Sequence, residues 1–465
     1  MTSRHVISIL ICLYIIISML VGVYIIWQSQ ERLSEFFSDH YNYLYIFVIA
    51  SIIFWLVIFF LRDKLRFVIV ISALFVLFSA FFLEFCLYLY VPSGVGGMGI
   101  ERAQKAIDLG MSPDLRSKID LFLEDERLVP AILAMNFDST NGLMTKEGNQ
   151  ILPLGGISRR NTLFCNESGY FSKYESDRFG FNNNNIEWDS EVIDWLLVGD
   201  SFTHGACVNR ENNIASSIKM TSGGSDSVIN LGIAGNGPML ELATLKEYAT
   251  IIKPKVVLWF YYEGNDLNPD LEREKQFTFL RKYLHPDFHQ DLFNRQVEID
   301  SVLNSFYKEE LDTQMFIHKT RFFRFYYLRR ALNVAQLTLF PEKITTDKKI
   351  KEVVDPLFLD ILKKARDMVH GWGGRFYFVY LPAHNRVLGD DNGPINLYSE
   401  KSLRVEIVAR VGALNIPVLD LQEKIFAIEN NPLELFPFKM PGHYTAEGYK
   451  KIGKVVFQCV GGVGC

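Results

Sequence analysis

Three long apolar runs lie within the first 92 residues of this 465-residue chain: Val6–Trp27, Tyr43–Leu61 and Phe67–Val91. A helix needs ~20 apolar residues to cross the hydrocarbon core of a bilayer, and each run is long enough to do so. The same 92 residues hold only ten charged side chains, although the whole chain has 48 basic and 53 acidic ones. The sequence therefore predicts a membrane domain of three transmembrane helices at residues 1–92 and excludes a wholly cytosolic soluble protein.

The first run is too long for a cleaved signal peptide, and no small-residue cleavage site follows it. Basic residues gather at Arg4 and in the 62–66 loop, whereas the loop at 28–42 holds one, Arg32. The positive-inside rule places the sides that are richer in Lys and Arg in the cytoplasm. We therefore expect an integral membrane protein with a cytoplasmic N-terminus and everything after Val91 outside the cytoplasm.

Two charged features invite a membrane interpretation. Glu84 lies inside the third run, near its outer end, where we expect the carboxylate to snorkel to the interface; the alternative is a partner or substrate path. His318–Arg330 interleaves basic and aromatic residues. We expect it to pack its aromatic rings on the exported domain with the basic groups solvated, and the alternative is a helix on anionic lipid headgroups.

The exported part is acidic enough to argue against a nucleic-acid partner, since the chain carries 48 − 53 = −5 formal charges. After a connector at 93–185, five apolar runs of strand length alternate with helical patterns. Runs that are apolar on both faces are typical of a parallel sheet buried between helices, and this alternation predicts a doubly wound α/β sandwich at 186–465. The five predicted strands are Val192–Val198, Ser227–Leu231, Val256–Tyr262, Phe376–Leu381 and Ile416–Leu419.

Four polar blocks sit where these elements end or begin. Ser201 follows the first strand, in Gly199-Asp200-Ser201, at the place where α/β sheets bind ligands. A glycine-rich loop containing Gly235 follows the second strand, and Asn265 follows the third. His443 stands just before the last predicted helix. A hydroxyl, an imidazole and nearby N–H donors are the groups that nucleophilic acyl transfer needs.

These four ordered blocks resemble the SGNH (GDSL) hydrolase superfamily, of the bacterial membrane-anchored type. The resemblance implies a flavodoxin-like three-layer α/β/α fold without a cofactor or metal. It makes Ser201 the nucleophile and His443 the general base, with the Ser201 N–H, the Gly235 N–H and the Asn265 side chain as oxyanion donors. It also implies a serine esterase of the bacterial inner membrane, with a periplasmic or extracytoplasmic catalytic domain that acts on O-acyl, notably O-acetyl, esters of envelope glycans or lipids.

Two alternatives stay open: a polysaccharide O-acetyltransferase that uses the same site, and a catalytically inactive glycan-binding or assembly protein. The second rests on Met440, because the superfamily usually has an acid three residues before the histidine. An orienting group fixes the imidazole tautomer, and its loss lowers the rate greatly in a well-studied triad. Glu434, Asp420 or a backbone carbonyl are the candidate replacements.

Other polar residues receive lesser roles. His384 follows the fourth strand and is a candidate substrate contact or a plain loop residue; we expect His204 to be structural and Asp266 to brace its own loop. Asn166-Glu167-Ser168 fits a glycosylation sequon. No CxxC pair or His-rich cluster suggests a metal site.

Four cysteines would face an oxidising compartment, where disulfides form. Cys459 and Cys465 are separated by a flexible run and form the predicted disulfide, while Cys165 and Cys207 are a weaker second pair without a spacing argument. An insertion at about 268–351 interrupts the alternation directly after Asn265 and Asp266. Long functional loops often serve as lids, so we expect this insertion to act on substrate choice.

Overall fold

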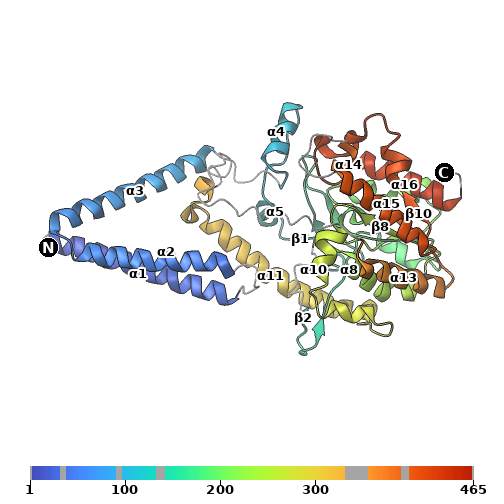
Figure 1. The fold of residues 1–465 in the computed structure, drawn as a ribbon, viewed down its shortest axis with the longest axis horizontal. Coiled ribbons are helices and arrows are strands. Elements are labelled where there is room, and N and C mark those ends of the chain that lie inside the picture. The colour runs from blue at the N-terminus through green and yellow to red at the C-terminus, as the bar shows by residue number, and fades with distance from the viewer. Residues whose placement is uncertain are drawn as a thin grey trace. The chain divides into compact units, whose positions relative to one another are not determined.

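The computed structural model describes residues 3–31, 38–90, 97–131, 142–329, 354–388 and 397–462. It divides into two compact units (Figure 1). Unit 1 comprises residues 1–91 and 321–339, and unit 2 comprises residues 92–320 and 340–465. The chain therefore passes between the units at three places.

Unit 1 contains three helices: α1 (Ser3–Glu31), α2 (Ser38–Phe59) and α3 (Asp63–Tyr90). The Tyr14 ring stacks on Trp55 at 4.3 Å and so joins α1 to α2. All three predicted spans are thus helical. Among the described residues, however, only Asp63–Leu89 is long and apolar enough to cross a membrane, because the apolar stretches described in α1 and α2 are shorter: His5–Val21 and Val48–Phe59.

Glu84 of α3 is fully buried, so the expectation that it snorkels to the interface is wrong. Its two carboxylate oxygens accept the backbone N–H groups of Tyr327 at 2.9 Å and Leu328 at 2.7 Å. These donors lie in the basic-aromatic stretch, at the start of a helical turn whose first N–H groups have no partner within the helix. The charge inside the third run is therefore held by another segment of the same unit.

The expectation for the basic-aromatic stretch is also wrong. His318 to Thr320 end the helix α11 (Gln296–Thr320), and the following residues pack on α3 instead of on the sheet domain. The Phe81 ring contacts Phe322 at 6.0 Å and Phe325 at 4.6 Å, and Tyr88 meets Tyr327 edge-on at 5.5 Å. The aromatic rings of this stretch therefore pack on an apolar helix of unit 1.

Unit 2 is built on a five-stranded parallel sheet in the order β10-β9-β8-β6-β7. Each of the five strands overlaps one predicted strand, and β8 has the predicted bounds. The strands are β6 (Trp195–Val198), β7 (Val228–Asn230), β8 (Val256–Tyr262), β9 (Arg375–Leu381) and β10 (Val418–Asp420). The chain leaves β6 for β7 on one side and then returns to β8 on the other. This reversal creates the crevice in which doubly wound sheets bind ligands.

Helices cover both faces of the sheet (Figure 1). One face packs against α8 (Pro238–Thr244), α13 (Pro356–Gly371) and α15 (Leu397–Ala413), and the other against α7 (Ile214–Thr221) and α16 (Ala446–Gly461). Alternate strand residues enter opposite cores, since Leu196 belongs to the first cluster and Leu197 to the second. α8 continues through a π-helical turn into α9 (Thr250–Ile252). The mixed α/β class with a parallel sheet is confirmed.

The connector holds more regular structure than its irregular sequence suggests. Its helices are α4 (Ile100–Asp108) and α5 (Lys118–Glu124), and a small sheet joins β1 (Leu128–Pro130), β4 (Asn161–Leu163) and β5 (Lys173–Glu175). β2 (Leu143–Met144) pairs with β3 (Gln150–Ile151). β4 and β5 are antiparallel, so the residues between them form the turn of a hairpin.

The insertion after β8 supplies part of the core. It contains α10 (Glu272–Glu274), short 3-10 turns at Leu280–Leu284 and Leu292–Asn294, and α11. Leu271, Leu280 and Leu303 are fully buried in the same cluster as one face of the sheet. α14 (His384–Leu388) follows β9 at the sheet edge.

Candidate active site

Ser201 begins α6 (Ser201–His204), a four-residue helix that starts three residues after the last residue of β6. The Asp200 side chain accepts the Phe202 N–H at 2.8 Å and so caps the helix. Gly205 closes it in the left-handed conformation, with φ 83°. The result presents the Ser201 hydroxyl at the carboxyl edge of the sheet, beside the crevice.

His443 lies just before α16, and its ring reaches Ser201 from the other end of the chain. The distance from Ser201 Oγ to His443 Nε2 is 2.8 Å, shorter than the 3.3 Å from Ser201 Oγ to the Asp200 carboxylate. The Phe202 ring packs against the imidazole, with centroids 4.8 Å apart. Both hydroxyl and imidazole keep partial exposure, so a substrate can reach them.

Glu167 completes the arrangement. Its Oε1 lies 3.0 Å from His443 Nδ1, and its Oε2 accepts the His443 backbone N–H at 2.8 Å. A carboxylate that accepts Nδ1–H leaves the Nε2 lone pair facing Ser201, which is the tautomer that a general base needs. Glu167, His443 and Ser201 thus form one continuous hydrogen-bonded chain.

The surroundings of Glu167 keep it ionised. Burial opposes this, but the hydrogen bonds and charge of His443, with the charge of Arg102, prevail and lower the pKa of Glu167. The Arg102 guanidinium lies 3.9 Å from Glu167 and also donates to the Pro441 carbonyl. Gly442 leaves room for this contact, because a Cβ there would stand 2.6 Å from Glu167 Oε2.

The expected substitutes for the missing acid lie elsewhere. Asp420 pairs with Arg404 at 2.5 Å, and Glu434 pairs with Lys439 at 3.1 Å. The carboxylate at His443 comes instead from the β4–β5 hairpin, 276 residues earlier in the chain. The sequence pattern marks Glu167 only as the middle of a glycosylation sequon, so it does not reveal the role of this carboxylate. The predicted disulfide between Cys165 and Cys207 does hold a signal. Cys165 lies two residues before Glu167 and Cys207 lies six residues after Ser201, so this bond would bring Glu167 close to Ser201.

The two further oxyanion candidates flank Ser201. Gly235 follows β7 with φ 80°, and its N–H has no hydrogen-bond partner within the described part of the chain. Asn265 follows β8, and its amide hydrogen-bonds to Asp200. An amide nitrogen carries two N–H donors, so one stays available to a substrate oxygen. The Ser201 N–H, at the first position of α6, has no partner within the helix.

His204 supports the Gly235 loop from behind, as expected of a structural residue. Its Nδ1 accepts the Ala234 N–H at 3.2 Å, so the proton resides on Nε2, which donates to Tyr174 Oη at 2.8 Å. Burial lowers the pKa of His204 to about 3, which keeps the ring neutral. The ring therefore fixes the residue directly before Gly235.

The remaining candidates have local partners. His384 is nearly buried, and its Nε2 lies 3.1 Å from the Lys439 carbonyl, so the ring contacts the loop that leads to His443. Asp266 accepts the Tyr262 N–H at 2.9 Å and braces its loop as expected. Asn166 is buried and bonds to the Asp114 carbonyl, which leaves no room for a glycan.

The disulfide expectations are partly resolved. Cys165 and Cys207 are bonded, with their Cα atoms 4.8 Å apart. Cys459 is disulfide-bonded too, but Cys465 lies outside the described residues, so that pair stays a prediction. Glu167, Cys207 and His443 approach one another as closely as metal ligands do. Since the Cys207 sulfur is bonded to Cys165, it offers no thiolate to a cation.

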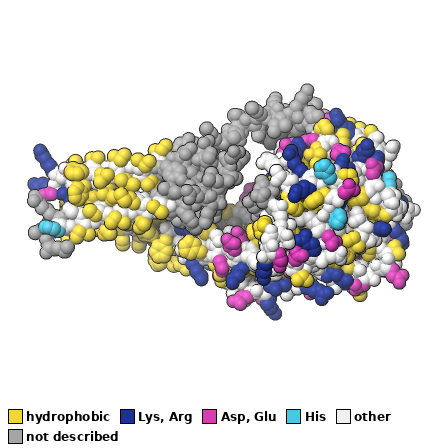
Figure 2. Space-filling view, turned by 90° about the horizontal axis from the view of Figure 1, so that it is seen from below, with side chains coloured by type: hydrophobic (Ala, Val, Ile, Leu, Met, Phe, Trp, Pro, Cys, Tyr) yellow, Lys and Arg dark blue, Asp and Glu magenta, His cyan; other side chains and the backbone are white. Residues whose placement is uncertain are grey.

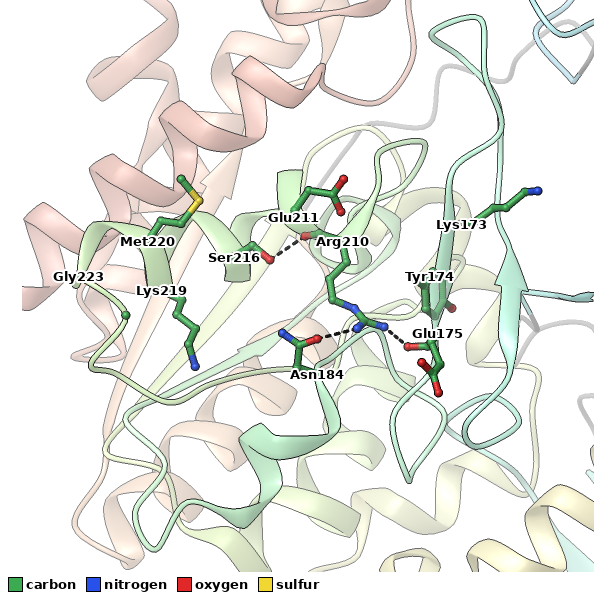
Figure 3. Close-up of a pocket in the computed structure, with 11 residues that line it drawn as sticks. Lys173, Tyr174, Glu175, Asn184, Arg210, Glu211, Ser216, Lys219, Met220 and Gly223 are labelled. Carbon is green, nitrogen blue, oxygen red and sulfur yellow. Dashed lines mark hydrogen bonds between the residues drawn. The ribbon is translucent and has the colours of Figure 1, made fainter.

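A pocket of about 800 Å³ opens elsewhere on unit 2, and none of the candidate catalytic residues lines it (Figure 3). Arg210 lines this pocket and donates to the Asn184 side chain at 2.8 Å and to the Glu175 carbonyl. Lys219 on its wall pairs with Glu187. Arg210 and Lys219 are thus bound to β5 and to the segment between β5 and β6.

No family model matches the sequence, and no curated protein sequence matches it. Several solved structures are similar at TM-scores below 0.5, including the three that follow. A lipase/acylhydrolase from Enterococcus faecalis is 14% identical over 58% of this chain and 97% of its own, with a TM-score of 0.32. An acetyl xylan esterase is 14% identical over 58% of this chain and 100% of its own, with a TM-score of 0.31. A carbohydrate acetylesterase family member from Sinorhizobium meliloti is 13% identical over 58% of this chain and 100% of its own, with a TM-score of 0.26.

Proposed function

We propose that the chain is a membrane-anchored serine esterase. The observation that carries the proposal is the continuous chain of hydrogen bonds from Glu167 through His443 to Ser201. This is the order of acid, base and nucleophile that activates a serine hydroxyl. Met440 was the single feature in favour of an inactive protein, and Glu167 supplies the carboxylate that Met440 does not.

The reaction proceeds in two acyl transfers. His443 Nε2 takes the proton as Ser201 Oγ attacks the ester carbonyl, and the new imidazolium is stabilised by Glu167. The oxyanion receives N–H donors from Ser201, Gly235 and Asn265. His443 then protonates the departing alkoxide and leaves an acyl group on Ser201. Water attacks this ester with His443 again as base, which releases a carboxylic acid and restores the serine.

The proposed substrates are O-acyl esters, notably O-acetyl esters, of envelope glycans or lipids. The support is the partial exposure of Ser201 and His443, together with the extracytoplasmic position that we propose for unit 2. A sugar hydroxyl in place of water would make the same groups an O-acyltransferase, and the geometry favours neither acceptor.

We further propose that α1, α2 and α3 span a bilayer, with the N-terminus in the cytoplasm and unit 2 outside it. Large apolar side chains cover the surface of these helices, whereas the surface of unit 2 mixes charged and apolar groups (Figure 2). Phe60, Phe75 and Phe78 of this region are each more than two-thirds exposed, which is expected of lipid-facing residues. The Cys165–Cys207 disulfide supports an oxidising compartment for unit 2.

Purified full-length protein in detergent tests the activity. It is expected to hydrolyse p-nitrophenyl acetate and to react with a fluorophosphonate probe at Ser201, while Ser201→Ala does neither. Adding acetylated and free oligosaccharides distinguishes release of acetate from its transfer to sugar. A folded wild-type protein whose Ser201 stays unlabelled would overturn the proposal.

Reporter fusions test the topology. Alkaline phosphatase fused after Gly99 is expected to be active, because that reporter works only outside the cytoplasm, and a fusion at Lys64 is expected to be silent. The reverse pattern would contradict the proposed orientation.

A further inference from the structure

Glu167 reaches His443 from a part of unit 2 that does not belong to the main sheet. Ser201 follows β6 and His443 precedes α16, so both are positioned by the sheet and its covering helices. Glu167 stands in the turn of the β4–β5 hairpin, whose strands pair, among the described residues, only with each other and with β1. The geometry of the triad therefore depends on how firmly this turn is fixed to the sheet edge.

A covalent bond makes that connection. Cys165 lies two residues before Glu167 and Cys207 lies six residues after Ser201, so the disulfide joins the turn that carries the acid to the segment that follows α6. The Cys207 sulfur lies 4.0 Å from His443 Nδ1, the nitrogen that also faces Glu167. The bond is thus in contact with the pair that it holds together.

Weaker contacts hold the rest of the hairpin to the same loop. The Phe164 ring lies 4.3 Å from that of His204, and the Lys173 N–H donates to the Asn209 side chain at 3.2 Å. These contacts flank the turn and do not involve sulfur. Without the disulfide the hairpin therefore stays docked, while the turn that presents Glu167 gains freedom.

We propose that the Cys165–Cys207 disulfide is a positioning element for Glu167, so that the enzyme is fully active only when this bond is formed. The inference rests on the proposed function, since it assigns a role within the same site. A dithiol reverses the bond: the S–S bond breaks, two S–H bonds form, and the two electrons and two protons come from the dithiol, which closes to a cyclic disulfide. Cys165 is partly exposed and offers the point of attack.

The test is a double-mutant cycle on the full-length protein. Cys165→Ala/Cys207→Ala is expected to lower kcat about a hundredfold, the effect of a ~1 Å misplacement of a catalytic group. In a Glu167→Gln background the same pair is expected to change kcat little, because the disulfide acts through Glu167. Multiplicative losses, or a wild-type kcat in the double cysteine variant, would overturn the proposal.

Two further measurements test the proposal if the double cysteine variant does not fold. Wild-type protein treated with dithiothreitol is expected to lose activity as the double variant does, and Cys459→Ala, which removes a different disulfide-bonded cysteine, is expected to keep it. Hydrogen exchange gives a readout that needs no activity: reduction is expected to speed exchange of the His443 N–H, which Glu167 accepts. If reduction leaves exchange of the His443 N–H unchanged, the positioning role is refuted, whether or not the protein is an esterase. If reduction speeds this exchange but the protein hydrolyses no ester, only the esterase proposal is refuted.

Discussion

At the scale of single residues, space beside Glu167 matters as much as charge. Gly442 has no side chain at the point where a Cβ would stand 2.6 Å from Glu167 Oε2 and 2.9 Å from the Arg102 guanidinium. Contacts under about 3 Å force one partner to move, and here both partners are held by other bonds. The glycine before the histidine is therefore part of the arrangement that lets the acid approach.

Gly442→Ala is accordingly expected to lower kcat by about a hundredfold with a smaller change in KM, because it displaces Glu167 while leaving Ser201 in place. Steady-state hydrolysis of p-nitrophenyl acetate measures both constants. Gly412→Ala is the matched control, since a Cβ at Gly412 meets nothing within 4 Å. Equal kcat values in the two variants would contradict the steric argument.

The identity of the acid gives a second prediction at this scale. Glu167→Gln is expected to reduce kcat by as much as ~10⁴, as removal of the acid does in a well-studied triad. Glu434→Gln and Asp420→Asn are expected to remain near wild type, because those carboxylates pair with Lys439 and Arg404. A large loss in either one, with Glu167→Gln unaffected, would reassign the acid.

At the scale of elements, β6 to β10 could be predicted because buried strands leave continuous apolar runs. Ser201, Gly235 and Asn265 could be placed together because each follows a strand of one sheet. Glu167 could not, since β4 and β5 have three residues each, too few to show an alternating pattern, and the contact joins residues 276 positions apart. The hydrogen bonds of Glu84 could not be predicted either, because their donors are backbone N–H groups, which almost every residue has.

The contact between α3 and the 321–329 segment gives the next prediction. Glu84→Leu leaves the Tyr327 and Leu328 N–H groups without acceptors, and each unsatisfied buried group costs about 1–3 kcal/mol. Faster hydrogen exchange is therefore expected in peptides from 321–329, measured on detergent-solubilised protein. Phe85→Leu serves as the control, since Phe85 is exposed on the same helix. Unchanged exchange in Glu84→Leu would show that packing of the aromatic rings alone holds the segment.

At the scale of the whole molecule, stability depends on carboxyl groups buried near the sheet edge. Glu241 of α8 is fully buried, and neither of its oxygens has a hydrogen-bond partner among the described residues. Burial, with the charges of Asp266 and Asp200 nearby, raises the pKa of Glu241 well above its usual value. The folded protein therefore keeps this group protonated at a pH where the unfolded chain releases the proton.

The sign of the pH dependence follows from linkage. The stability contributed by a protonated Glu241 is complete below the unfolded pKa of 4.5 and is lost as the pH rises toward the folded value. Glu241→Gln removes the titration of this group, so the fall in Tm as the pH rises above 4.5 is expected to be shallower than in wild type. Exposed Glu211→Gln is the control, and parallel Tm curves for all three proteins would contradict the assignment.

The division of unit 1 into two stretches of sequence has a consequence for biosynthesis. Glu84 is made 243 residues before Tyr327, the first of its two hydrogen-bond donors. At ~5–20 residues per second, the ribosome needs roughly 12–50 s to supply that donor. During this interval the carboxylate of α3 has only water, lipid headgroups or a chaperone to bind, while β6, β7 and β8 of the main sheet are translated. The nascent protein thus carries an unpaired carboxylate on an apolar helix until the 321–329 segment is made and its backbone N–H groups bind it.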